Sequence, residues 1–331
     1  MKIIVDAMSG DNAPRAQIHG AFDASYECDA DIVLVGRTEV INRVIKEDNI
    51  DASRFEIIEA PEIISMEDDA TSVLKSKRNS SMGKAFDLLA KGYGDAMVSA
   101  GNTGAVLSGA TLIVKRVKGV KRAALAPIMP SSAGKFVLID CGANVECKSE
   151  YLVQFGKLGS IYAENVLDIK NPRVGLVNNG TEESKGTELY VETNRLLREC
   201  DDLNFVGNIE GRDIPLGAAD VVVADGFTGN VILKLTEGVG AFFSNYIKDM
   251  FKSSFAGKIA AMLVMKKINA LKKTMDYKEV GGSPLLGISK PVIKAHGNAD
   301  ERCFKNAIKQ AINFAKSDAI KKQIEAFDVK E

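Results

Sequence analysis

Short runs of apolar, mostly β-branched residues recur along the chain and alternate with longer amphipathic stretches. Several of these runs are apolar at consecutive positions, as expected for strands that are buried on both faces. The stretches between them, such as 150–166 and 182–199, repeat apolar residues every three or four positions, which predicts helices. This alternation predicts an α/β fold with a mainly parallel sheet that helices cover on both sides. The predicted strands are residues 2–6, 32–35, 55–59, 96–99, 123–129, 136–140, 173–177 and 220–224.

The chain length of 331 residues allows one large α/β unit or two domains. Neither a low-complexity linker nor an internal repeat marks a boundary, so we expect a single compact unit over 1–331. One segment departs from the strand–helix rhythm, at about 240–278. Between Met250 and Met275 it has six lysines and no acidic residue, and Val264 shares an apolar stripe with Ile268, Leu271 and Met275. This pattern predicts a basic amphipathic helical segment.

Composition narrows the range of functions. A formal net charge of -1 gives no reason to expect nucleic acid as a partner. Five cysteines without a C-x-x-C pair and only two histidines make a zinc site unexpected, so no metal is predicted. The N-terminus lacks the apolar run of a signal peptide, and no stretch approaches the roughly 20 apolar residues of a spanning helix. We therefore expect a cytoplasmic protein, with attachment to a membrane surface left open.

Glycine, asparagine and threonine gather in the loops that follow four predicted strands, at 99–104, 140–144, 178–186 and 225–230. In open α/β sheets the ligand crevice lies outside the carboxyl ends of the strands, so we expect these loops to face one crevice. The sequence contains no G-x-S-x-G elbow, no G-x-x-x-x-G-K-[ST] phosphate loop and no complete G-x-G-x-x-G. Serine hydrolases, Walker-type nucleotidases and standard dinucleotide enzymes therefore lose support.

The same loops favour an anion site. Gly101, Asn102 and Thr103 precede a predicted helix, so free backbone N–H groups would point into the crevice. Thr181 and Thr228 stand at similar turns, where they would cap helices. Any one loop alone is explained as a cap or a turn, whereas four together are harder to explain that way. Farther along, 281–287 has the composition of an irregular loop, and 292–297 predicts a last strand that runs to His296.

Taken together, these loops resemble the PlsX family of bacterial phosphate acyltransferases. The similarity runs in order from about residue 3 to residue 315. Ser9 and Asn12 depart from the family, which usually has glycine and often has histidine at these two positions, and this weakens any catalytic role for position 12. The matching segments are 5–14, 99–105, 142–144, 152–155, 180–183 with 185–186, 207–213, 225–230, 282–287 and 294–297.

The resemblance implies a three-layer α/β/α fold like that of isopropylmalate dehydrogenase and phosphotransacetylase, and a homodimer. It implies an acyltransferase that converts long-chain acyl-[acyl carrier protein] and inorganic phosphate to acyl-phosphate, which feeds phospholipid synthesis. No metal or organic cofactor is expected.

Direct attack of a phosphate oxygen on the thioester carbonyl is the simplest route, and positioning with preorganised donors would supply most of the rate. We expect Lys185 to neutralise phosphate charge or stabilise the oxyanion, Asn230 to orient one substrate, and His296 to protonate the leaving sulfur. The expected substrate-binding residues are Ser99, Gly101, Asn102, Thr103, Thr181, Asp225, Thr228 and Gly229.

The basic segment is predicted to contact an anionic membrane surface, where each lysine contributes up to about 1 kcal/mol. A dimer-interface helix pair and a docking patch for the acidic carrier protein remain alternatives. The expected membrane contacts are Lys258, Val264, Lys266, Lys267, Ile268 and Leu271.

Two other functions stay open. A phosphotransacetylase that uses short-chain acyl-coenzyme A would share the fold, and a non-catalytic membrane-bound scaffold would have kept it. A decarboxylating dehydrogenase of related fold is less favoured, because no cluster of aspartates suited to a divalent metal is evident.

Overall fold

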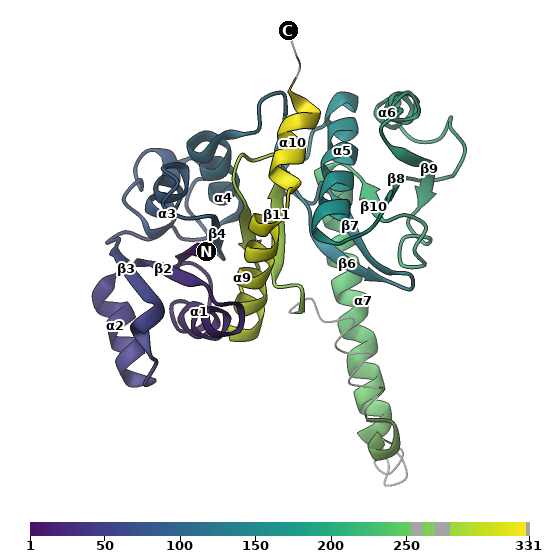
Figure 1. The fold of residues 1–331 in the computed structure, drawn as a ribbon. Coiled ribbons are helices and arrows are strands. Elements are labelled where there is room, and N and C mark those ends of the chain that lie inside the picture. Colours follow the sequence, from purple (N-terminus) through teal and green to yellow (C-terminus); the bar gives the residue numbers. More distant parts are fainter. Residues whose placement is uncertain (253–260, 266, 268–278, 329–331) are drawn as a thin grey trace.

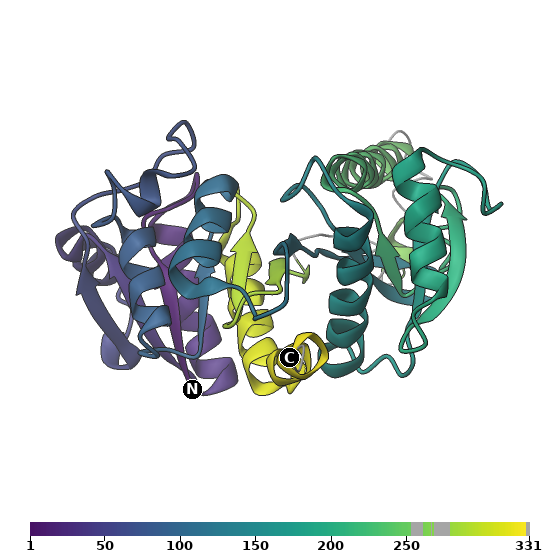
Figure 2. The same ribbon diagram turned by 90° about the horizontal axis from the view of Figure 1, so that it is seen from above.

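The computed structural model describes residues 1–252, 261–265, 267 and 279–328. Its strands form two sheets, one of seven strands in the order β3-β2-β1-β4-β12-β11-β5 and one of five in the order β6-β7-β10-β8-β9. Seen from above, the sheets define two lobes that lie side by side, with β11, α9 and α10 on the inner edge of the first (Figure 2). Most strand pairs are parallel; β11 with β12, β11 with β5, and β6 with β7 are antiparallel.

The elements alternate along the chain as an α/β fold requires (Figure 1). The strands are β1 Lys2–Asp6, β2 Asp31–Gly36, β3 Phe55–Glu59, β4 Ala96–Ser99, β5 Ala124–Leu125, β6 Ile128–Ser131, β7 Gly134–Ile139, β8 Arg173–Asn178, β9 Asn204–Glu210, β10 Val221–Val223, β11 Gly282–Leu286 and β12 Val292–Ala295. The helices are α1 Arg15–Cys28, α2 Thr38–Glu47, α3 Ser81–Ala90, α4 Thr103–Gly109, α5 Ser149–Val166, α6 Glu188–Arg198, α7 Gly226–Lys252, α9 Glu301–Lys316 and α10 Ala319–Phe327. Short 3₁₀ turns lie at Ala52–Arg54 and Ser72–Leu74, and a π-helical stretch, Ala110–Lys115, follows α4.

Helices cover both faces of the seven-stranded sheet. Successive strand residues point to opposite faces, so Val5 and Ile293 pack with α1 and α9, whereas Met97 and Val292 pack with α3 and α4. The five-stranded sheet is covered by α5 on one face and by the first turns of α7 on the other. The predicted α/β class with a mostly parallel sheet is therefore confirmed.

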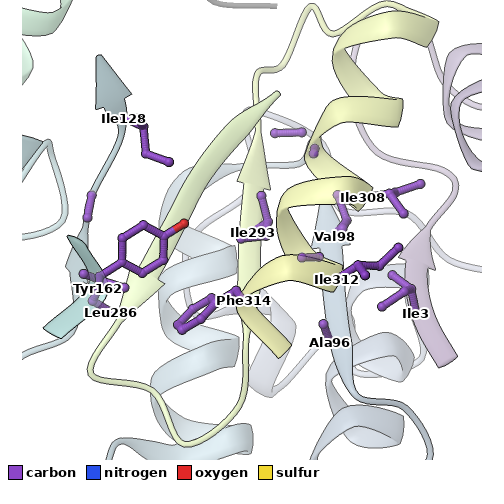
Figure 3. Packing of buried hydrophobic residues seen from close by; sticks show 14 of the residues in the cluster. Ile3, Ala96, Val98, Ile128, Tyr162, Leu286, Ile293, Ile308, Ile312 and Phe314 are labelled. Atoms are coloured by element: carbon purple, nitrogen blue, oxygen red, sulfur yellow. The ribbon is translucent and has the colours of Figure 1, made fainter. Parts of the chain in front are cut away.

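One apolar core is shared by the two lobes. It contains strand residues of both sheets together with α5 and α9. At its centre the Tyr162 ring of α5 packs edge-on against Phe314 of α9, with ring centroids 5.2 Å apart (Figure 3). Such pairs are stabilising beyond the apolar area they bury, so this contact helps to hold the lobes in a fixed relation.

Three predicted elements differ from the structure by more than a shift of one or two residues. The strand predicted at 123–129 is two strands in different sheets, because the chain passes between lobes at Ala126 and Pro127, where Pro127 has no N–H to continue a ladder. Residues 282–286, expected as an irregular loop, form the fully buried strand β11 despite their glycine and proline. Helix α6 begins at Glu188 instead of 182, so Thr181 does not cap it.

Helix α7 projects away from the body of the molecule (Figure 1). Its exposed apolar side chains recur every three or four residues, which places them on one stripe. Residues 261–265 and 267 are also helical, with Leu263 83% exposed, whereas Lys258, Lys266, Ile268 and Leu271 lie outside the described residues. No helix in the described part of the chain is long and apolar enough to cross a bilayer. The exposed stripe on α7 consists of Phe227, Val231, Leu235, Val239, Phe242, Phe243, Tyr246 and Met250.

Candidate active site

The carboxyl ends of β1, β4 and β12 are tied together by hydrogen bonds. The Ser99 hydroxyl donates to the Asp6 carboxylate at 2.7 Å, and the Gly101 N–H donates to the Ser99 hydroxyl at 3.2 Å. The Asp11 N–H donates to the Gly297 carbonyl at 2.8 Å, which joins the loop after β1 to the loop after β12. Three segments far apart in the sequence therefore form one rim on the first lobe.

Asp6 is fully buried under this rim. Burial raises the pKa of Asp6, and the hydroxyls of Ser81, Ser9 and Ser99 oppose that rise by stabilising the ionised form. Because Ser99 is also buried and bonded to Asp6, its hydroxyl serves first to join β4 to β1.

Asn102 holds the loop before α4 in place. Its carboxamide oxygen accepts from the Ala105 N–H at 3.0 Å, which caps the helix, and its amide donates to the Met66 carbonyl at 2.9 Å. Both the oxygen and the nitrogen of the Asn102 carboxamide are therefore hydrogen-bonded within the protein. The half-buried Thr103 begins the helix, and the buried Gly101 comes two residues before it.

On the second lobe, Asp140 organises the loop after β7. Its carboxylate accepts from the N–H groups of Leu125 at 2.8 Å, Cys141 at 2.7 Å and Asn144 at 2.6 Å. Burial raises the pKa of Asp140 to about 6, against the effect of these hydrogen bonds. Since Leu125 belongs to β5, this carboxylate also ties the two lobes together.

The first turn of α7 lies against this loop at van der Waals distance. A Cβ added at Gly229 would lie 1.9 Å from the Asp140 carbonyl oxygen, and one at Gly142 would lie 2.9 Å from the Asn230 amide nitrogen. The Cys141 thiol donates to the Gly229 carbonyl at 3.4 Å. Only glycine permits this approach at 229, and it brings the exposed Asn230 beside the loop after β7.

Asp225 caps α7, a role that the sequence suggested for Thr228. Its carboxylate accepts from the Phe227 and Thr228 N–H groups, both at 2.9 Å, and from the Thr228 hydroxyl at 2.7 Å. The Tyr190 hydroxyl donates to the same carboxylate at 2.5 Å. Burial opposes ionisation of Asp225, but the hydrogen bonds from Tyr190 and Thr228 outweigh it and lower the pKa.

Lys185 lies in the exposed loop between β8 and α6, together with Thr181. Its ammonium is 3.9 Å from Glu182, and its carbonyl accepts from the Asn178 amide at 3.0 Å. Tyr190 links the start of α6 to Asp225, so this loop is adjacent to the start of α7. In the described part of the chain Lys185 bonds to its own loop and not directly to Asn230 or His296.

Helix α7 and strand β12 meet between the lobes. Asn230, Lys234 and Glu237 stand at i, i+4 and i+7, which places them on one face of α7. Glu237 lies 3.8 Å from the His296 ring nitrogen at the end of β12, and Lys234 lowers the pKa of the buried Lys294. Burial lowers the pKa of His296, while Glu237 works in the opposite direction. This face of α7 is therefore turned toward the rim of the first lobe.

The structure groups the predicted site residues into two sets. Ser99, Gly101, Asn102, Thr103 and His296 lie on the rim of the first lobe. Thr181, Lys185, Asp225, Thr228, Gly229 and Asn230 lie on the second, and α7 brings the two sets together at His296. Among the described residues, no three histidine, cysteine, aspartate or glutamate side chains are arranged to hold a metal ion.

Sequence reasoning missed Lys234, Glu237 and Lys294. The sequence could have indicated the first two, because Lys234 and Glu237 follow Asn230 at the spacing of one helix face. The signal for Lys294 was a lysine inside an otherwise apolar strand.

Solved structures of other proteins share the fold of this chain. A phosphotransacetylase from Streptococcus pyogenes matches with a TM-score of 0.63 and 19% identity, over 95% of this chain and 94% of that one. A branched-chain phosphotransacylase from Enterococcus faecalis matches with a TM-score of 0.58 and 12% identity, over 96% and 99% of the two chains. The chain therefore has the fold of the phosphotransacylases.

Sequence relatives identify the family. The model of a family described as "Fatty acid synthesis protein" matches residues 1–322. A phosphate acyltransferase from Clostridium novyi is 46% identical over 98% of this chain and 99% of its own length. One from Clostridium tetani is 46% identical over 97% and 96% of the two chains. The chain belongs to the phosphate acyltransferase (PlsX) family, and it is an acyltransferase.

Proposed function

We propose that this enzyme transfers a long-chain acyl group from acyl carrier protein to inorganic phosphate, giving acyl-phosphate for phospholipid synthesis. The observation that carries the proposal is the meeting of α7 with β12. There Asn230, Lys234 and Glu237 face Lys294 and His296 beside the glycine-rich loop after β4. Cations, amide donors and a histidine at the ends of buried strands suit a reaction between an oxyanion and a neutral thioester.

The reaction proposed is a direct displacement at the thioester carbonyl. A phosphate oxygen forms a bond to the carbonyl carbon, the carbon–sulfur bond breaks, and the carrier protein leaves as its thiol. The backbone N–H group of Thr103 and the Lys185 ammonium would stabilise the negative charge of phosphate and of the developing oxyanion. Asn230 and the Asp225–Thr228 turn would position the acyl donor from the opposite side.

One proton must move from hydrogen phosphate to the departing sulfur, and we assign this transfer to His296. Because burial keeps its pKa below the ordinary histidine value, the neutral ring predominates near pH 7. A neutral ring accepts the phosphate proton first and then donates it to sulfur. Glu237 would orient the ring and stabilise its charged form.

Trapping the product tests this function. Pure enzyme incubated with palmitoyl-carrier protein and phosphate should yield palmitoyl hydroxamate when hydroxylamine is added. Faster turnover of acetyl-coenzyme A than of the carrier thioester would instead support a short-chain phosphotransacetylase. If phosphate causes no cleavage of any thioester tested, the result would support a non-catalytic scaffold.

Replacing Lys185 with methionine is expected to lower kcat/KM for acyl-phosphate formation about 100-fold, because one preorganised donor to the oxyanion is lost. The exposed Lys170, before β8, supplies a matched Lys→Met control that should retain wild-type activity. The hydroxamate assay measures both. A folded K185M enzyme with near-wild-type turnover would exclude Lys185 from the mechanism.

We also infer that the apolar stripe of α7 packs against the same stripe of a second subunit. The stripe extends over several helical turns, and Leu235, Phe242 and Tyr246 are each more than 60% exposed. Exposed apolar surface of this extent is rare on a monomer, and pairing of identical stripes is the usual way to cover it.

The helical residues 261–265 and 267 support a second proposal, reversible contact with an anionic membrane surface. Met262, Leu263, Val264 and Met265 are all exposed, and the exposed Lys267 follows them. An apolar patch beside a lysine suits the boundary between acyl chains and anionic headgroups.

Two variants with reciprocal readouts test these contacts. Phe242→Asp is expected to convert a dimer to a monomer in light scattering, because it places a charge in the buried stripe. Lys267→Glu should leave the dimer intact and weaken co-sedimentation with vesicles containing phosphatidylglycerol. A wild-type monomer would contradict the first proposal, and equal binding to neutral and anionic vesicles would contradict the second.

A further inference from the structure

A row of polar side chains crosses the middle of the seven-stranded sheet. Lys294 of β12 is in register with Ser283 of β11 on one side and Ser99 of β4 on the other. Ser99 in turn bonds to Asp6 of β1. All four are buried on the face that α3 and α4 cover, since Val292 and Met97, two residues before Lys294 and Ser99, pack there.

Lys294 is the cation of this row, and none of the described residues supplies a counter-ion. Only 7% of the residue's surface is exposed, and among the described residues no carboxylate lies within ion-pair distance of its ammonium. The ammonium donates to the Ala295 carbonyl at 2.6 Å, which directs it toward the carboxyl end of the strand. In the described part of the chain its two remaining N–H donors have no protein acceptor.

The charges around Lys294 do not compensate for its burial. Burial, and to a smaller extent the neighbouring Lys234, lower its pKa to about 8, while Asp11 and Asp6 act more weakly in the opposite direction. A buried charge without a partner is destabilising, so its presence at the end of a strand points to a ligand that supplies the missing negative charge.

We propose that the Lys294 ammonium is a binding group for the tetrahedral phosphate anion, which it contacts from the floor of the rim between β4 and β12. This deepens the proposed function and rests on it for the role of phosphate as nucleophile. Phosphate offers several acceptor oxygens, enough to satisfy both unpaired Lys294 donors and Lys234 together. The loop after β4 lies next to this position, because Ser99 is the register partner of Lys294.

Phosphate-dependent thermal unfolding of the full chain tests the assignment without any thioester. With inorganic phosphate titrated at constant ionic strength in potassium chloride, the Tm of the wild type should rise, since a ligand of the folded state stabilises it. Lys294→Met should weaken apparent phosphate affinity at least about tenfold. Without phosphate this variant should be no less stable than the wild type, because methionine replaces a buried charge by an apolar side chain of similar length.

Lys91→Met, at an exposed lysine after α3, is the matched control and should keep the wild-type response. A K294M protein that is stabilised by phosphate as much as the wild type would overturn the assignment, as would a wild type that does not respond at all. These outcomes are separate from failure of acyl transfer. An enzyme that binds phosphate through Lys294 but forms no acyl-phosphate would refute the proposed function alone.

Discussion

Replacing Gly229 with alanine is expected to lower the free energy of unfolding by about 3 kcal/mol and to abolish acyl transfer. The added methyl group would lie 1.9 Å from the Asp140 carbonyl oxygen, a backbone atom that cannot rotate away. Relief requires α7 to move off the loop after β7, which breaks the contact between Cys141 and Gly229 and shifts Asn230. Overpacking against a rigid neighbour has costs of this size. Urea denaturation and the hydroxamate assay measure the two effects.

Gly211→Ala is the control for this substitution. A Cβ at Gly211 meets nothing within 4 Å, so its stability should stay within about 0.5 kcal/mol of wild type. A Gly229→Ala enzyme as stable and active as the Gly211→Ala enzyme would show that α7 is not clamped onto the β7 loop.

Replacing Lys294 with methionine is expected to change the pH dependence of stability as well as phosphate binding. The pKa of Lys294 falls from 10.5 to about 8 on folding, which corresponds to about 3 kcal/mol of destabilisation when both states are protonated. Because the folded-state pKa is the lower one, this cost is fully present below pH 8. It declines as the pH rises from about 8 to about 10.5, where the unfolded chain also loses its proton.

Denaturation of wild type and K294M at several pH values in phosphate-free buffer measures this effect. The variant should be the more stable protein at pH 7, and the difference should shrink toward zero near pH 10.5. Other titrating groups are common to both proteins, so their contributions cancel in the difference. A difference that does not vary with pH would mean that Lys294 is hydrated, not buried as a cation.

Much of the fold was predictable, because continuous apolar runs and period-3.6 patterns report burial directly. The strands β1, β3 and β4 have the predicted bounds. Strand β11 was missed because its Gly-Ser-Pro sequence has turn composition, and only pairing with β12 and β5 stabilises it as a strand. The division into two sheets was not visible either. The run 123–129 is almost continuously apolar, and its only sign of a break is Pro127, which has no N–H donor.

The candidate site was predictable where loops follow strands and not where side chains meet across lobes. The loops that contain Gly101 and Asn230 were found because glycine and asparagine collect there. The proximity of Glu237 to His296 depends on the path of α7, which no local pattern encodes. Whether Lys185 and Asn230 act in catalysis stays a prediction.

The strand order also determines when the first sheet can be completed during synthesis. Strand β4 ends at Ser99, yet its neighbour β12 begins only at Val292, after the whole five-stranded lobe. On the ribosome, β4 therefore emerges as an unpaired edge and stays so until nearly the last residues are made. Contacts of such high sequence separation form slowly, so the side of β4 that carries the Ser99–Lys294 pair is the last part of the nascent sheet to close.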